Sequence, residues 1–182
     1  MINVSEIKTF PPQSYKNAVQ QKAFEVLAQL DIPFYRVEND EAITMEDCES
    51  IDTRLEAKTV KTLFLCNRQQ TAFYLFVTPG DKPFRTKNFG AALKISRVSF
   101  APGGLLQEML GTIIGATTIF SVFRDTENRV QVVIDNDVLK NEWYACSDGT
   151  TTGYMKIPVK RLIDDILPYS NHVAKYITVS AE

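Results

Sequence analysis

The chain has 182 residues, 45% of them hydrophobic and 23% charged, which is enough for one globular domain with a sizeable core. A net charge of −2 and a pI near 5.5 exclude a general basic coat for nucleic-acid backbone and leave room only for a local basic patch. Three cysteines without CxxC spacing, and the absence of a signal peptide or a long apolar span, favour a cytoplasmic protein with reduced thiols and no membrane contact.

The chain opens with a polar segment that is followed by an amphipathic helix. Met1–Pro12 ends in a Pro-Pro break, and we interpret it as an N-terminal arm ahead of a single domain over residues 13–182. Between Tyr15 and Leu30, apolar residues recur every three or four positions, which predicts a helix with one apolar stripe. Ser14 is the expected cap of this helix.

A short strand and a short helix are expected next. Phe34–Glu38 alternates between apolar and polar residues, as a half-buried strand does, after Pro33 has ended the first helix. Thr44 is followed three residues later by Asp47, a spacing that resembles a capping box and predicts the start of a helix.

Runs of β-forming residues dominate the rest of the chain. Thr62–Asn67 and Thr71–Thr78 are separated by three polar residues, a spacing that suits a hairpin. Further strands are expected at Ile95–Phe100, Val130–Ile134, Glu142–Cys146, Gly153–Ile157 and Ala174–Val179. Helices are expected at Thr86–Lys94, from Pro102 to near Gly111, at Asn136–Lys140 and at Val159–Leu167. This interleaving predicts an α/β domain with a mixed sheet rather than a doubly wound parallel one.

Two stretches contain the residue types that bind a ligand. Lys61 precedes an apolar β-forming run, so its ammonium is expected at the mouth of a buried strand. Leu110–Ser121 holds Gly111, Gly115 and three threonines, and such a loop offers backbone N–H groups to an anion or a carbonyl oxygen. Ordinary interpretations remain open for each: a solvated lysine, a helix C-cap and a turn.

Five motifs occur in the order and spacing of one known family. They are Val60–Leu65, Arg97–Ala101, Leu110-Gly111, the loop Gly115–Ile119 with Asp125 after it, and Val130–Asp135. With them, the chain from about Val19 to Val179 resembles the YbaK/prolyl-tRNA editing family, and most closely its freestanding deacylases, which act on alanine mischarged to proline tRNA. The resemblance implies a mixed, partly barrel-like sheet flanked by helices, and trans-editing hydrolysis of a mischarged aminoacyl-tRNA.

The resemblance also implies a site. Lys61 would contact the terminal phosphate or ribose, and the backbone N–H groups of Gly115, Ala116, Thr117 and Thr118 would bind the ester carbonyl. Substrate contacts are expected from Thr44, Gly111, Ile119, Ser147, Thr150, Thr151 and Thr152. No metal or cofactor is expected. The expected partners are the acceptor end of the aminoacyl-tRNA and prolyl-tRNA synthetase, and the expected oligomeric state is a monomer.

The sequence departs from the family pattern at three places. Glu38-Asn39-Asp40 replaces Glu-His-Pro, and Ser147–Tyr154 replaces His-Pro-x-x-Asn-Thr-x-Thr, so both histidines are missing. Ile119 replaces the proline that ends the glycine loop, which removes a rigid φ. These departures keep two alternatives open: a non-catalytic module that binds an amino acid, an aminoacyl group or a protein partner, and a hydrolase of another small acyl ester.

Neither a thiol nor a histidine is expected to do the chemistry. Cys146 has no histidine near it in sequence, and the lone His172 is expected at the surface or at a helix end. Ser147–Thr150 is by default a turn between strands. The hydroxyls of Thr150–Thr152 are the side-chain hydrogen-bonding groups that we expect in the cleft.

Overall fold

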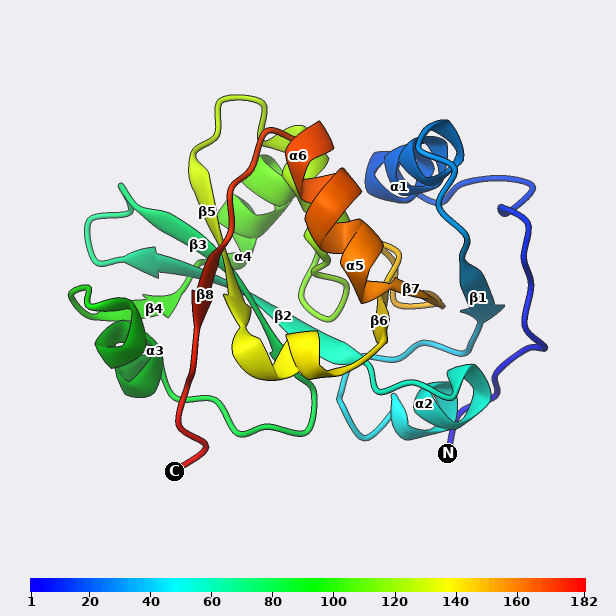
Figure 1. The fold of residues 1–182 in the computed structure, drawn as a ribbon, viewed down its shortest axis with the longest axis horizontal. Coiled ribbons are helices and arrows are strands. Elements are labelled where there is room, and N and C mark those ends of the chain that lie inside the picture. Colours follow the sequence, from blue (N-terminus) through cyan, green and yellow to red (C-terminus); the bar gives the residue numbers. More distant parts are fainter.

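A computed structural model describes residues 1–182, and its strands form two sheets (Figure 1). The smaller sheet is antiparallel, in the order β1 (Tyr35–Glu38), β7 (Gly153–Pro158), β6 (Trp143–Ser147). The larger sheet has the order β4 (Val98–Phe100), β2 (Val60–Asn67), β3 (Phe73–Pro79), β5 (Val130–Asp135), β8 (Lys175–Ile177). The α/β class and the mixed sheet are confirmed. Neither sheet closes into a barrel, because β4 and β8 lie at opposite edges of the larger one.

The larger sheet combines an antiparallel half and a parallel half. β2 and β3 form the predicted hairpin, with Leu63 opposite Phe76, and β4 pairs antiparallel with the other edge of β2. β5 is parallel to β3, and β8 is parallel to β5. A parallel connection needs a crossover, and the chain between β3 and β5 first adds β4 at the far edge of the sheet before it crosses back to form β5. That crossover contains the glycine loop.

Short helices cover the sheets (Figure 1). The longer ones are α1 (Ala18–Gln29), α2 (Glu49–Leu55) and α3 (Thr86–Leu93). α4 (Gly103–Leu105) continues as a π-helical segment over Leu106–Leu110, and α5 (Val159–Arg161) and α6 (Leu167–Tyr169) are joined by another over Leu162–Ile166. 3₁₀ helices occupy Ile119–Arg124 and Asn136–Lys140. None of these helices has the length and apolar character needed to cross a membrane.

Local hydrogen bonds correct the predicted start of two helices. Asn17, not Ser14, caps α1, because its side chain accepts a hydrogen bond from the N–H of Gln20 at 2.8 Å. Thr44 and Asp47 do form the reciprocal bonds of a capping box, each 3.2 Å long. Turns follow them, however, and α2 begins only at Glu49.

The strand expected from Ile95 is shorter than predicted at its start. Lys94 ends α3 with a φ of +58°, and the N–H of Ile95 donates back to the carbonyl of Gly90 at 3.0 Å. This helix C-cap uses the backbone that a strand would need. β4 therefore begins at Val98.

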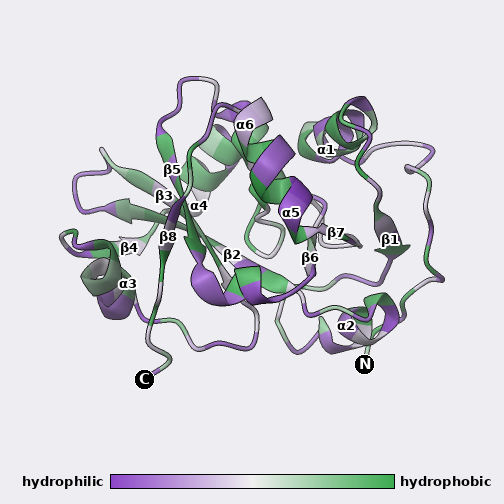
Figure 2. Ribbon diagram, in the orientation of Figure 1, coloured by the Kyte–Doolittle hydropathy of each residue, from purple (hydrophilic) through white to green (hydrophobic).

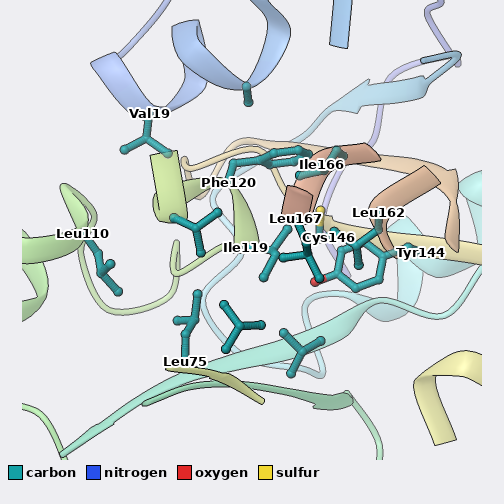
Figure 3. Close-up of a cluster of buried hydrophobic side chains, with 14 of the residues drawn as sticks. Val19, Leu75, Leu110, Ile119, Phe120, Tyr144, Cys146, Leu162, Ile166 and Leu167 are labelled. Atoms are coloured by element: carbon teal, nitrogen blue, oxygen red, sulfur yellow. The ribbon is translucent and has the colours of Figure 1, made fainter. Parts of the chain in front are cut away.

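One hydrophobic core joins the two sheets. Its largest cluster combines side chains of β2, β3 and β5 with those of β6, β7, α1 and the C-terminal helices. Figure 3 shows part of it, with Ile119 near Tyr144, Leu162 and Leu167. α1 carries apolar and polar residues on different faces (Figure 2). The sheets also meet through a single bridge between Thr59 and Ala145, so the start of β2 lies at their junction.

The segment predicted as an N-terminal arm lies along β1. The N–H of Ser5 donates to the carbonyl of Glu38 at 2.7 Å, and Lys8 and Arg36 exchange two backbone hydrogen bonds of 2.8 and 2.9 Å. Arg54 of the α2 helix also donates to the carbonyl of Ser5 at 2.6 Å. The arm therefore covers the outer edge of the smaller sheet.

Candidate active site

A cavity of about 370 Å³ lies where the two sheets meet. Its walls come from the first half of β2, the end of β4, the loop that precedes the 3₁₀ helix Ile119–Arg124, the segment before α2, and the smaller sheet. Most lining side chains are apolar. The polar groups are contributed by Lys61, Thr62, Gly115, Thr117, Ser147 and Tyr154. The cavity thus brings together four residues that the sequence predicted for the site: Lys61, Gly115, Thr117 and Ser147.

Lys61 is the cation of this cavity. It lies near the start of β2, opposite Thr78 of β3, and is half-buried. Burial lowers the pKa of its ammonium, and the nearby carboxylate of Asp81 opposes this shift. Asp81 itself pairs with the exposed Lys58 at 3.0 Å, whereas the Nζ of Lys61 donates to the backbone carbonyl of Lys82. The amine therefore has a neutral partner.

The glycine loop supplies backbone donors. Gly115 has a φ of +92°, and a Cβ there would lie 3.2 Å from Cγ2 of Ile43, so the position requires glycine. The N–H of Ala116 is already used, because it donates to the carbonyl of Ile113 at 3.0 Å. The N–H groups of Gly115 and Thr117 have no acceptor within the protein. Two unpaired donors therefore belong to residues that line the cavity.

The next two residues of the loop fix it in place and do not line the cavity. The Thr118 hydroxyl donates to the carbonyl of Ser147 at 2.6 Å and accepts from the N–H of Phe120 at 3.4 Å. Ile119 is fully buried in the core (Figure 3), because the 3₁₀ helix that it begins turns its side chain inward. The two residues anchor the loop to the smaller sheet and to the core.

Apart from Thr44, the remaining predicted site residues lie around a second hollow of about 320 Å³. Gly111, Ala116, Thr150, Thr151 and Thr152 line it. Because Ala116 lines this hollow while its neighbours line the cavity, the loop forms a wall between the two.

Three threonine hydroxyls that were predicted to contact substrate already have protein partners. The hydroxyl of Thr150 donates to Asp148 at 2.7 Å, and that of Thr152 accepts from Lys16. Thr44 lies between two cavity residues, Ile43 and Met45, but its hydroxyl accepts from the N–H of Asp47. We find none of these three among the residues of the cavity itself.

Sequence reasoning missed the residues that close the cavity. Tyr154, which is 6% exposed, and Cys48 lie beside each other, and burial raises the pKa of both groups. Ile43, Ile114 and Phe100 line the cavity although each is more than half exposed, so they border its mouth. Tyr154 is the last residue of the segment Ser147–Tyr154, and the departure of that segment from the family pattern was the one sequence signal for the residues that close the cavity.

A buried carboxylate organises the turn between β6 and β7. Asp148 is 3% exposed and accepts hydrogen bonds from Gln20 Nε2 at 2.8 Å and from the N–H and hydroxyl of Thr150 at 3.0 and 2.7 Å. Desolvation raises its pKa to about 6 despite these bonds. A Cβ at Gly153 would lie 2.2 Å from its Oδ2, so this packing requires glycine there.

The two candidate catalytic side chains that the sequence disfavoured are both buried. Burial raises the pKa of the Cys146 thiol well above its usual value, which disfavours a thiolate nucleophile. His172 was expected at the surface or at a helix end; it follows the end of α6, and its side chain is buried. It is 3% exposed, and its Nε2 lies 2.8 Å from Oδ2 of Asp125. Asp125 also accepts from the N–H groups of Arg129 and Val130, so the pair ties the end of the 3₁₀ helix to β5.

Comparison with known proteins agrees with this architecture. The sequence model of the aminoacyl-tRNA editing domain matches residues 40–164. The prolyl-tRNA editing protein ProX of Acetoanaerobium sticklandii is 30% identical over 120 residues, which cover 66% of this chain and 73% of that protein. The prolyl-tRNA synthetase associated domain-containing protein 1 of Danio rerio is 28% identical over 114 residues, which cover 63% of this chain and 61% of that protein.

Two solved structures share the fold at low sequence identity. The crystal structure of a hypothetical protein superposes with a TM-score of 0.66 at 16% identity, over 86% of this chain and 98% of the other. The crystal structure of a proposed trans-editing enzyme for prolyl-tRNA synthetase superposes with a TM-score of 0.65 at 14% identity, over 91% of this chain and 100% of the other. Since the family's sequence model covers more than half of the chain, this protein belongs to the aminoacyl-tRNA editing domain family.

Proposed function

We propose that this protein hydrolyses the ester bond of a mischarged aminoacyl-tRNA, and that its substrate is alanine attached to proline tRNA. One observation carries the proposal: the same largely apolar cavity is lined by a half-buried lysine and by two residues whose backbone N–H groups have no acceptor within the protein. Membership of the editing family and the names of the two sequence relatives, which refer to prolyl-tRNA, support the choice of substrate class.

The chemistry needs few groups, because an aminoacyl ester is already activated. In the proposed arrangement, the N–H groups of Gly115 and Thr117 bind the ester carbonyl and stabilise the oxyanion that forms when water attacks. One such donor is worth on the order of 3 kcal/mol in the transition state. The ammonium of Lys61 contacts the terminal phosphate or ribose and so fixes the ester in position. No side chain has to act as a nucleophile.

The apolar lining of the cavity suits an apolar aminoacyl group such as alanyl. Tyr154 and Cys48 close it on one side, and Leu106 and Phe64 contribute apolar surface. A methyl side chain is compatible with this surface and leaves no polar group unpaired. Prolyl-tRNA synthetase is the proposed partner, since it makes the mischarged product that the protein would remove.

A deacylation panel tests the proposal. Proline tRNA charged with alanine, serine, cysteine or proline is incubated with the purified protein, and the remaining ester is followed over time. We expect alanine to be released at least about ten times faster than proline, which corresponds to an activation barrier lower by about 1.4 kcal/mol. A Gly115→Val variant should lose most of this activity, because its side chain would collide with Ile43. Equal release with and without the protein for all four esters would contradict the proposal.

A non-catalytic binding module is the second candidate. Asn39 stands where the family has a histidine, and its side chain donates to the carbonyl of Thr151 at 3.2 Å, so it acts there as a structural group. The absence of both family histidines favours this candidate. Saturable binding of alanyl-tRNA without any turnover would support it, whereas release of alanine from a simple alanyl ester but not from tRNA would support a general esterase.

A further inference from the structure

The distribution of charge along the chain is uneven. Residues 57–107 contain eight lysines or arginines and a single acidic residue, Asp81, although the whole chain has a net charge of −2. Asp81 pairs with Lys58, and Lys82 pairs with Asp135 and Asp137 at 2.8 and 3.0 Å. Lys61 belongs to the cavity. Five cations remain in this stretch, and each is exposed and takes part in no ion pair: Arg68, Arg85, Lys87, Lys94 and Arg97.

The fold gathers these five residues at one end of the larger sheet, which we call the α3–β4 surface. The antiparallel register places Asn67 opposite Val98, so Arg68 and Arg97 emerge at the same end of the β2–β4 pair. α3 packs there through Phe89, which shares a cluster with Val98. Figure 1 shows α3 and β4 together beside the tip of the β2–β3 hairpin.

Two of the five cations lie at α3. Lys87 lies in the first turn of the helix, Lys94 is the C-cap residue that follows Leu93, and both are exposed. The side chain of Asn88, the residue after Lys87, donates hydrogen bonds to the carbonyls of Ser180 and Glu182, so the acidic Glu182 also lies near α3. Lys87 is two residues from the buried Phe89, so it lies on the opposite face of the helix.

This surface is continuous with the mouth of the cavity. Arg85 follows Phe84, whose ring contacts the ring of Phe100 edge to face with centroids 5.7 Å apart. Phe100 lines the cavity and is 56% exposed. A row of cations that leads to an exposed aromatic ring fits a nucleic acid, because phosphates pair with the cations and an unpaired base stacks on the ring.

We propose that the α3–β4 surface binds the phosphate backbone of the tRNA acceptor stem, and that Phe100 stacks on an unpaired base at its end. The inference rests on the proposed function, since that function supplies an RNA whose 3′ end enters the cavity. On this surface, the acceptor stem would run from the mouth of the cavity past Phe84 and Arg85 and then along α3. An acidic protein surface is the competing occupant, but it would not require the exposed ring.

The test is a charge reversal that leaves the cavity untouched. The double variant Lys87→Glu with Lys94→Glu is compared with a control of identical net charge, Lys22→Glu with Lys175→Glu. Those two lysines are also exposed and unpaired, and they lie on α1 and β8. Both variants are assayed on full-length alanyl-tRNA and on a short alanylated oligonucleotide that has the same 3′-terminal bases and no stem.

For the double variant Lys87→Glu with Lys94→Glu, called the patch variant, we expect kcat/KM on full-length tRNA to fall about tenfold at low salt. The control should stay within about twofold of the unmodified protein. The plot of log(kcat/KM) against log salt should become shallower by about 1 to 2, because each lost phosphate contact removes about 0.7 to 0.9 from the slope. The loss should be confined to the substrate that has a stem. Equal losses in both variants, or an equal loss on the short substrate, would overturn the proposal.

Binding of an uncharged acceptor-stem minihelix, followed by fluorescence anisotropy, separates this inference from the proposed function. If the unmodified protein releases no alanine but the patch variant binds the minihelix more weakly than the control does, the surface is supported and the catalytic proposal fails. If all three proteins bind the minihelix equally, the α3–β4 surface does not take RNA.

Discussion

Lys61 combines two properties that rarely occur together in a surface lysine. Its side chain is half-buried, with a pKa that burial lowers, and its Nζ donates to the carbonyl of Lys82 instead of to a carboxylate. A structural lysine at a strand edge would more often be solvated or paired with an acid. The position of Lys61 in the cavity wall, three residues after the exposed and acid-paired Lys58, allows these two interpretations to be separated experimentally.

Replacing Lys61 with methionine should lower deacylation without unfolding the protein. Methionine keeps an apolar side chain of similar length and removes the charge, so kcat/KM should fall at least about tenfold while the free energy of unfolding changes by less than about 1 kcal/mol. Lys58→Met is the matched control and should retain full activity. Unchanged activity in Lys61→Met would place the lysine outside the site, and a collapse of the urea midpoint would show that its role is structural.

Asp148 should make stability depend on pH in an unusual direction. Its pKa is about 6 in the folded protein and near 3.8 in the unfolded chain, so the folded state holds the proton more tightly. The stabilisation is therefore fully present below pH 3.8 and is lost as the pH rises through 6, with a total on the order of 3 kcal/mol. Asp148→Asn should remove this dependence.

Urea unfolding at pH 4, 5, 6 and 7 measures the effect. As the pH rises, the free energy of unfolding of the unmodified protein should fall relative to that of Asp148→Asn. Asp164→Asn, which changes an exposed carboxylate on the segment between α5 and α6, serves as the control. A difference that stays constant across these pH values would show that Asp148 is already ionised at pH 4.

At the scale of elements, local patterns predicted most helices and strands. The hairpin of β2 and β3 and the strands β5, β6 and β7 follow from runs of apolar and β-branched residues. The 3₁₀ helix Ile119–Arg124 was not predicted, because it depends on the cap by Thr118 and on packing of Ile119 into a distant core. The resemblance located the loop before it but gave no indication that Thr118 and Ile119 would serve as its anchors.

Ile119 begins that 3₁₀ helix, and its N–H has no acceptor within the protein. Proline is well suited to such a first helical position, where no hydrogen bond is lost. Ile119→Pro should therefore fold, at a cost of about 1 to 3 kcal/mol for the lost packing of a fully buried side chain, and its rigid φ should keep or raise the deacylation rate per folded molecule.

Ile119→Val is the control for this variant, since it shortens the side chain without fixing the backbone. Thermal unfolding gives the stability of each protein, and single-turnover kinetics give the rate. A proline variant that is folded but slower than the valine variant would show that the loop needs its backbone freedom.

At the scale of the whole molecule, the arrangement of two sheets could not be read from the sequence. Each strand was recognisable, but pairing partners far apart in the chain, such as β1 with β7 and β5 with β8, depend on contacts that no local pattern encodes. The same limit applies to the site: Ser147 reaches the cavity, while Thr150–Thr152 line the second hollow. The turn Ser147–Thr152 therefore contributes residues both to the cavity and to the second hollow.

The shared core predicts that both sheets unfold together. Trp143 is the only tryptophan, and it lies in the smaller sheet, where its ring contacts that of Tyr35 with centroids 5.6 Å apart. Its fluorescence therefore reports on that sheet, while far-ultraviolet circular dichroism reports on the whole protein. The two signals should give the same urea midpoint, because one cluster joins both sheets. Two separate midpoints would mean that the smaller sheet opens first.

The arm along β1 also has a consequence for any shortened version of this protein. Residues 1–12 cover a sheet edge and keep the guanidinium of Arg36, which is 4% exposed, bonded to the carbonyl of Phe10 at 2.5 Å and near its ring. Trimming the chain to residues 13–182 would leave a row of unpaired backbone groups and a cation that has lost an acceptor. Two trimmed copies would then satisfy these backbone groups by pairing edge to edge, so the shortened protein should self-associate.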